Sequence, residues 1–332
     1  MFDWKYWLKR ALHRLAKKRF IPSVRYCLEC SHHVQRNHRG HAIIAFGWRY
    51  RKPDKRNYPL KQILPRRVRR LPSSFDLRKE NLTAPVGNQG NEGSCTGFAY
   101  YAMKGHEKVS GTYPEHGISP RHIYNAARAA EDRLSEEGAY SEDLFKYGLK
   151  VGVCRWDTWP YHAHVDSTRW PPPDTAVQEA PDYKIQSYAQ LNQAGEDVIE
   201  NIKQTLHQVK SPVYMGTAWP KSWVSPPRGV CPLPSDGEDI VGGHAWVIVG
   251  WDDREQHLIA ENSWGAFWGD RGFFAFPYEA FGWFAKYGYD CFKGMDAPSP
   301  KPPGPDPDPL IRFLRELIEW LQKKLKELES RK

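Results

Sequence analysis

Cys95 is the residue whose type and surroundings point most directly to chemistry. It lies in the stretch VGNQGNEGSCTGFAY at 86–100, just before a run that predicts a helix at 97–109. A helix N-terminus lowers the pKa of a thiol and so favours the thiolate, which is the nucleophile. Gln89 can direct its amide to the same point, where acyl transfer needs a donor to the developing oxyanion. The alternative is an ordinary Gly-rich turn around a buried cysteine.

A histidine and an asparagine further along the chain are candidate partners for this thiol. His244 heads the apolar stretch HAWVIVGW at 244–251, and a cysteine nucleophile needs an imidazole beside it. Asn262, in ENSWGAFWGDRGFF at 261–274, can accept a hydrogen bond from the second ring nitrogen and orient the histidine. The indole of Trp264 would shield the pair from water. Taken singly, these residues also fit a strand-edge histidine and a polar turn.

Together these residues resemble the papain family of cysteine peptidases. The order is Gln, Cys, His, Asn-x-Trp, and His244 and Asn262 follow Cys95 by 149 and 167 positions. The sequence LPSSFDLR at 71–78 resembles the start of the mature family domain, and the resemblance extends over roughly 71–293.

The resemblance implies a fold and a set of roles. The fold class is α+β, with a helical left part, an antiparallel β-barrel-like right part and an active-site cleft between them. Cys95 is the expected nucleophile, His244 the general base and Asn262 its orienter, with Gln89 in the oxyanion hole. No metal or organic cofactor is expected, and the substrate is a peptide or protein. The expected substrate-binding residues are Gly138, Ala139, Gly243 and Trp264.

The sequence departs from the family pattern beside the nucleophile. The family often has Cys three residues before the nucleophile and Trp directly after it, where this chain has Glu92 and Thr96. The first change removes a usual disulfide, and neither change removes a catalytic group. Papain has Asp where this chain has Gly243. Two other functions stay open: a peptide ligase or transpeptidase at the same site, and an inactive papain-like module that binds an acidic partner.

The order of elements also predicts an α+β architecture with two sub-domains, because helical patterns come first and strand patterns later. An amphipathic helix is expected at 195–209. Strands are expected at 213–219, 244–251, 257–264 and 272–277.

The charges divide the chain into a basic leader and an acidic body. Residues 1–70 carry 20 Lys/Arg against 3 Asp/Glu, a balance of +17, while the remainder carries 28 against 36, a balance of −8. A helix is expected at 2–20, packed on its own protein or, as the alternative, lying on a membrane surface. We expect the leader to lie against the body near the cleft, or to bind an acidic partner such as nucleic acid or anionic lipid. The expected divisions are 1–70 leader, with an extended linker at 48–72, 71–295 peptidase domain, 296–309 Pro-rich linker and 310–332 amphipathic helix. That last helix could mediate self-association.

The six cysteines are expected to be mostly reduced. The N-terminus lacks the continuous apolar stretch of a signal peptide, which favours a cytoplasmic location. Cys27 and Cys30 have zinc-knuckle spacing, but a single C-x-x-C is a weak metal signal, so plain thiols are the preferred interpretation. The nearby histidines are His32, His33, His38 and His41.

Overall fold

The computed structural model describes most of the chain between residues 25 and 295. The described residues are 25–27, 32–34, 43–52, 54, 57, 59–64, 66–104, 117–193 and 197–295. The chain divides into two compact units, 1–297 and 298–332, and all described residues belong to the first. The expected helices at 2–20 and 310–332, the Pro-rich linker, Cys30, His38 and His41 lie outside the described residues. No helix in the described ranges is long and apolar enough to cross a membrane.

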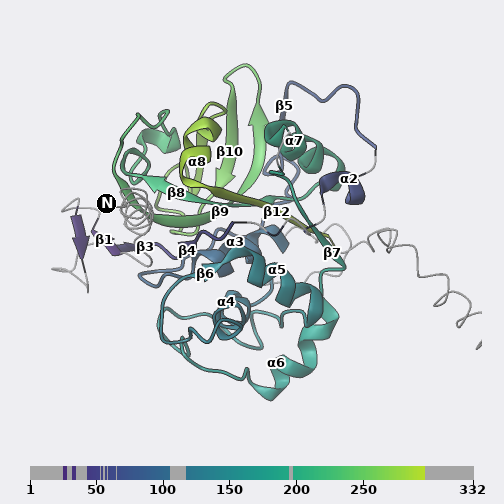
Figure 1. Cartoon of the computed structure of the whole chain (residues 1–332), viewed down its shortest axis with the longest axis vertical. Helices are drawn as coiled ribbons and strands as arrows, with labels where there is room; N and C mark the ends of the chain where they lie inside the picture. Colours follow the sequence, from purple (N-terminus) through teal and green to yellow (C-terminus); the bar gives the residue numbers. More distant parts are fainter. Residues whose placement is uncertain are drawn as a thin grey trace, which may run out of the picture. The chain divides into compact units, whose positions relative to one another are not determined.

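Helices make up one half of the described unit, the lower half in Figure 1. Ser119 caps α4 by accepting a hydrogen bond from the backbone N–H of His122, and Pro120 occupies the first turn, as is common at helix starts. The helices are α3 (Cys95–Lys104), α4 (Pro120–Ala129), α5 (Ser141–Lys150) and α6 (Asp174–Glu179), followed by the 3-10 helix Ala180–Tyr183.

A sheet with antiparallel pairing forms the other half, flanked by α7 (Val198–Val209) and α8 (Ala280–Tyr287). The strand order is β11-β10-β9-β8-β12-β7, and β5 pairs with β9. The strands are β5 (Ser74–Asp76), β7 (Ser187–Gln190), β8 (Val213–Pro220), β9 (Ile240–Asp252), β10 (His257–Glu261), β11 (Phe273–Pro277) and β12 (Tyr289–Met295). Short 3-10 helices lie at Lys221–Trp223 and Pro227–Gly229.

The described part of the leader is more ordered than its composition predicts. β1 (Arg25–Cys27), β2 (His32–Val34) and β3 (Ile43–Ala45) form a small sheet, and α2 (Leu60–Ile63) follows later. The expectation of an extended linker over 48–72 was wrong at Leu60–Ile63, which is helical. β4 (Trp48–Arg49) is extended, but it is a paired strand. β4 pairs in parallel with β6 (Ala139–Tyr140) of the body, so tertiary hydrogen bonds override the local Arg/Pro-rich composition.

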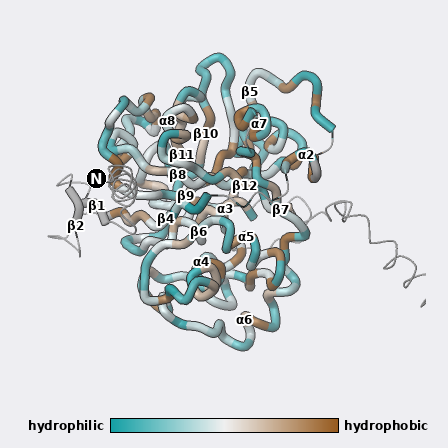
Figure 2. The backbone as a smooth tube through the Cα atoms, in the orientation of Figure 1, coloured by the Kyte–Doolittle hydropathy of each residue, from teal (hydrophilic) through white to brown (hydrophobic). Residues whose placement is uncertain are grey.

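The core lies between the two halves and includes part of the leader. Hydrophilic residues dominate the outer loops in Figure 2, whereas the central strands are more apolar. Phe46 and Trp48 of the leader are as buried as the core residues of β8 and β9, at 0% and 1% exposure. The leader segment 44–50 is therefore packed as part of the body.

Candidate active site

Cys95 is the first residue of α3, so the helix begins two positions before the start expected at 97. It follows the nucleophile loop, residues 88–94, in which the Ser94 carbonyl accepts hydrogen bonds from the N–H groups of Gly97 and Phe98 in the first helical turn. The thiol is fully buried. The backbone amides of Ala245 and Gly47 lie near enough to act on it. Ala245 directly follows His244, so the structure brings the start of α3 against the start of the apolar part of β9.

His244 is held by Asn262 and enclosed by aromatic rings. Asn262 Oδ1 accepts a hydrogen bond from His244 Nε2 at 2.7 Å. Trp264 lies over the imidazole at 4.6 Å between ring centroids, and Trp219 meets it edge-on at 4.9 Å. His244 Nδ1 is buried and has no hydrogen-bond partner among the described residues. This arrangement leaves Nδ1 available to exchange a proton with a thiol or a substrate.

Gln89 is positioned by Ser263, a residue that the sequence analysis did not single out. Ser263 Oγ donates to Gln89 Oε1 at 2.7 Å, and the Ser263 backbone N–H donates to Asn262 Oδ1 at 2.7 Å. Gln89 Nε2 donates to the carbonyl of Glu92 at 2.8 Å and to the carbonyl of Ala45 in the leader at 3.1 Å. Ser263 thus orients both amide side chains of the site. Its position directly after Asn262 is the sequence feature from which its role could have been predicted.

The leader runs directly across this site. The Phe46 ring meets His244 at 5.8 Å and Trp264 at 5.7 Å between centroids. Gly47 donates its N–H to the Gly243 carbonyl at 3.0 Å and accepts from the Ala139 N–H at 2.8 Å. A Cβ on Gly47 would collide with the nucleophile loop at the carbonyl of Gly93, so only glycine allows this close approach.

Charged contacts fasten the leader just after Gly47. Arg49 pairs with Glu136 at 3.1 Å. Arg51 binds Asp143 through two hydrogen bonds of 3.0 and 3.1 Å and pairs with Glu131 at 2.8 Å. In these pairs a basic residue of the leader contacts acidic residues of the body, in agreement with the opposite net charges of the two parts.

The covered site holds its reactive groups uncharged. Burial raises the pKa of the Cys95 thiol to about 12, although backbone amides act in the opposite direction. Burial lowers the pKa of His244 to about 3, although its hydrogen bond with Asn262 opposes this. Each shift disfavours the charged form, because a buried charge loses its hydration. The covered site therefore disfavours a thiolate–imidazolium pair.

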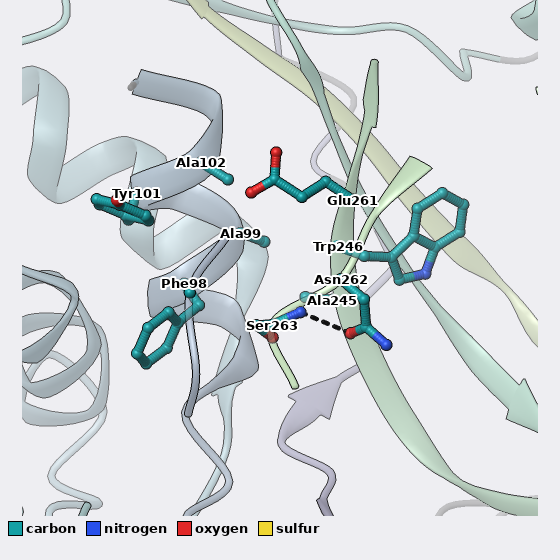
Figure 3. Close-up of a pocket in the computed structure, with 10 residues that line it drawn as sticks. Phe98, Ala99, Tyr101, Ala102, Ala245, Trp246, Glu261, Asn262 and Ser263 are labelled. Atoms are coloured by element: carbon teal, nitrogen blue, oxygen red, sulfur yellow. Dashed lines mark hydrogen bonds between the residues drawn. The ribbon is translucent and has the colours of Figure 1, made fainter. Parts of the chain in front are cut away.

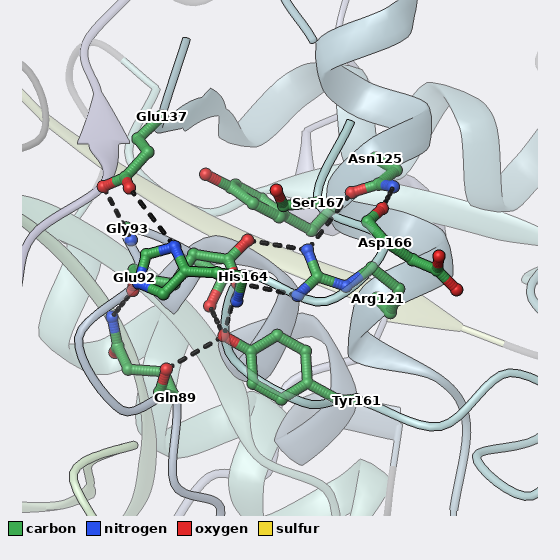
Figure 4. Close-up of polar contacts among 12 residues, drawn as sticks. Gln89, Glu92, Gly93, Arg121, Asn125, Glu137, Tyr161, His164, Asp166 and Ser167 are labelled. Atoms are coloured by element: carbon green, nitrogen blue, oxygen red, sulfur yellow. Dashed lines mark hydrogen bonds and ion pairs between the residues drawn. The ribbon is translucent and has the colours of Figure 1, made fainter. Parts of the chain in front are cut away.

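Glu92 is a buried ionic anchor in the position where the family often has cysteine (Figure 4). Its carboxylate accepts hydrogen bonds from Arg121 Nη1 and Nη2 at 2.6 and 2.7 Å and from the His164 N–H at 2.6 Å. Tyr161 Oη lies 3.1 Å from Glu92 Oε2 and 2.9 Å from the Gln89 carbonyl. Burial raises the pKa of Glu92, but Arg121 outweighs that effect and holds it below its ordinary value. The cluster ties the nucleophile loop to α4.

A small cavity of about 10 Å³ lies behind the site, between α3, the middle of β9 and the end of β10 (Figure 3). Glu261, the residue before Asn262, extends toward α3 there, and its Oε2 has no hydrogen-bond partner among the described residues. Burial raises the pKa of Glu261 to about 8. Glu261 was not identified from the sequence, where it lies within the strand expected at 257–264.

The expected substrate-binding residues take different positions. Ala139 and Gly243 face the leader backbone through the hydrogen bonds to Gly47. Gly138, with φ of 88°, instead donates its N–H inward to Tyr124 Oη at 2.8 Å. Trp264 is 1% exposed and covers His244. Gly138 thus supports the wall through Tyr124, whereas the amide that faces the cleft belongs to Ala139.

Comparisons with known proteins bear on the same region. Residues 71–282 match the sequence profile described as papain family cysteine protease. An uncharacterized peptidase C1-like protein of Acanthamoeba polyphaga mimivirus is 30% identical over 262 residues, which are 70% of this chain and 81% of that protein. A cysteine protease of Blomia tropicalis is 26% identical over 61% of this chain and 60% of that protein. The crystal structure of xylellain, a cysteine protease from Xylella fastidiosa, has a TM-score of 0.63 and 28% identity over 75% of this chain and 95% of that chain.

Proposed function

Because this chain belongs to the papain family of cysteine proteases and is a thiol endopeptidase of that family, we propose a role for each residue of its site. The Cys95 thiolate attacks the peptide carbonyl carbon. Gln89 Nε2 and the Cys95 N–H stabilise the oxyanion, and His244 gives its proton to the leaving amine. Water activated by His244 then hydrolyses the acyl-enzyme, while Asn262 keeps the imidazole oriented.

One contact carries the oxyanion-hole assignment. A carbonyl oxygen of the leader, on Ala45, accepts a hydrogen bond from Gln89 Nε2 at 3.1 Å. The amide that is expected to bind the substrate oxyanion is therefore already engaged with a peptide carbonyl. Oxyanion donors act at this kind of distance, about 2.7–3.1 Å.

We also propose that the leader inhibits the enzyme until it is displaced. Phe46 covers His244, Gly47 takes up backbone groups of both cleft walls, and Arg51 fastens the segment to Asp143. The uncharged state of Cys95 under this cover supports the same proposal. The ion pairs of Arg51 are partly exposed, so they should weaken as the salt concentration rises.

A reducing compartment such as the cytoplasm is the proposed setting. Four described cysteines are free, and Glu92 with Arg121 provides the anchor at the place where the family often has a disulfide.

The test compares the full-length chain with a loosened chain, which we define as full-length protein carrying Phe46→Ala and Arg51→Glu. We expect the loosened chain to hydrolyse fluorogenic peptides faster and to react faster with a Cys-directed epoxide, with the adduct mapped to Cys95 by mass spectrometry. In the loosened chain, Cys95→Ala should abolish hydrolysis and Gln89→Ala should lower kcat by about 10²–10³.

Lys61→Glu is the matched control, because it reverses a charge on the exposed face of α2. It should behave as the wild type. Equal rates for the wild-type and loosened chains would refute inhibition by the leader, and hydrolysis that survives Cys95→Ala would refute the catalytic assignment.

A further inference from the structure

Trp48 makes the most specific contact between the leader and the body. Its Nε1 donates to Asp290 Oδ2 at 2.8 Å and lies 3.0 Å from Ser141 Oγ. The indole is 1% exposed, and its ring lies so close to Gly216 that a Cβ there would collide with it. The side chain therefore fills a pocket that has a carboxylate at its base.

The body alone builds this pocket, which we call the Trp48 pocket. Ser141 begins α5, Tyr214 and Gly216 lie on β8, and Asp290 lies on β12. Ser141 Oγ donates to Asp290 Oδ2 at 2.6 Å and lies 3.0 Å from Tyr214 Oη. None of these residues belongs to the leader. When Trp48 leaves, Asp290 loses its indole donor.

The surroundings of the pocket are acidic. Glu142 and Asp143 follow directly in α5. Glu142 pairs with Lys146 at 3.2 Å within the helix, whereas Asp143 is paired with Arg51, a leader residue that also binds Glu131. Departure of the leader removes Arg51 and uncovers these carboxylates, so the wall gains negative charge when the cleft opens.

We propose that the Trp48 pocket is a specificity pocket that accepts a long basic side chain, arginine or lysine, of the peptide substrate. This inference rests on the proposed peptidase function. A guanidinium or ammonium group would donate to Asp290 where the indole donates now, and charge-assisted hydrogen bonds are about twice as strong as neutral ones. Gly216 leaves room for the long stem. Burial raises the pKa of Asp290 to about 7. A cationic side chain beside it would favour its charged form, whereas an acidic side chain would oppose it.

The side-chain preference of the Trp48 pocket can be tested without catalysis, by changing the leader residue that fills the pocket and measuring how fast Cys95 is labelled. In the full-length chain, Trp48→Lys and Trp48→Met place side chains of similar length in the pocket, of which only lysine is charged. We expect Cys95 in Trp48→Lys to react with the epoxide about tenfold more slowly than in Trp48→Met, because lysine paired with Asp290 keeps the leader in place. Adding Asp290→Asn should remove this difference. Equal or faster labelling of Trp48→Lys, or a difference that survives Asp290→Asn, would overturn the proposal.

A tetrapeptide library with each position varied in turn gives the second test, in the loosened chain. At one position, Arg or Lys should exceed Leu by about tenfold in kcat/KM, and Asp290→Asn should bring that ratio toward one. Asp236→Asn, which changes an exposed carboxylate far along the chain, is the matched control and should leave the ratio unchanged. Cleavage without a basic preference overturns the pocket but not the peptidase function. If no peptide is cleaved, the peptidase function fails, and the labelling test still decides the pocket.

Discussion

At the scale of single residues, the buried carboxyl of Glu261 links the stability of the site to pH. Burial raises its pKa from the ordinary 4.5 to about 8. The folded protein therefore keeps a proton that the unfolded chain releases between these two values. Stability is fully present below pH 4.5 and falls as pH rises toward 8, by about 1.4 kcal/mol per pH unit at most.

We expect Glu261→Gln to cancel this loss, because the amide stays neutral at every pH. The thermal midpoint of the variant should match the wild type near pH 5 and exceed it by about 5 °C or more at pH 9. Scanning calorimetry at both pH values measures the difference. Glu255→Gln, an exposed change nearby, serves as control and should show no such trend. A difference between wild type and Glu261→Gln that does not change with pH would contradict the assignment.

At the scale of elements, one buried ion pair connects the nucleophile loop to α4. Glu92 and Arg121 are 1% and 0% exposed, and the Glu92 carbonyl also accepts from Gln89. Because Arg121 holds the pKa of Glu92 below its ordinary value of 4.5, this pair stabilises the fold above that pH and is lost as pH falls further. Its pH dependence is thus opposite in sign to that of Glu261.

We expect Glu92→Leu to cost about 3–5 kcal/mol of unfolding free energy, because it leaves the Arg121 guanidinium buried without its carboxylate. The double variant Glu92→Leu/Arg121→Leu should recover part of this loss, since it removes the buried charge as well. Urea denaturation of the single and double variants gives the coupling. Glu80→Leu, which breaks a surface pair with Lys210, is the control and should cost at most about 1 kcal/mol. A double variant less stable than Glu92→Leu would contradict this account.

At the scale of the whole molecule, the four cysteines whose side chains the structure describes share one state, unpaired and buried. Cys95, Cys154, Cys231 and Cys291 are all free and buried. Burial raises the pKa of Cys154 to about 12 and those of Cys231 and Cys291 well above the ordinary value. Of these four, Cys95 is the thiol on which the leader acts directly, through the backbone amides of Gly47 and Trp48.

We therefore expect iodoacetamide to label Cys95 alone among these four in the folded, loosened chain, and all four after denaturation without reductant. Peptide mapping by mass spectrometry measures both patterns. Reductant should raise peptide hydrolysis without changing the thermal midpoint. A disulfide that joins any two of the four in freshly purified protein would contradict the prediction.

The sequence by itself determined the chemistry and the fold class. Cys95, His244 and Asn262 each lie in a local motif whose residue types and spacing are tied to acyl transfer, so their identification needed no contacts. The α+β papain-like fold is confirmed by the matched structure, and the strands β8 to β11 appear close to where apolar stretches predicted them. These features depend on local sequence patterns, which can be recognised without knowing any three-dimensional contact.

Only the tertiary structure decided how distant residues complete the site. Trp48 reaches Asp290 across 242 positions, and Arg121 reaches Glu92 across 29. Burial alone sets the raised pKa of Glu261, and burial depends on how α3 packs against the sheet. The place of the leader also depends on long-range contacts. Its composition predicted an extended linker, but hydrogen bonds to β6 of the body make Trp48–Arg49 a paired strand. Such long-range pairs leave no periodic pattern in the sequence, because each partner's own neighbours are unrelated to the contact.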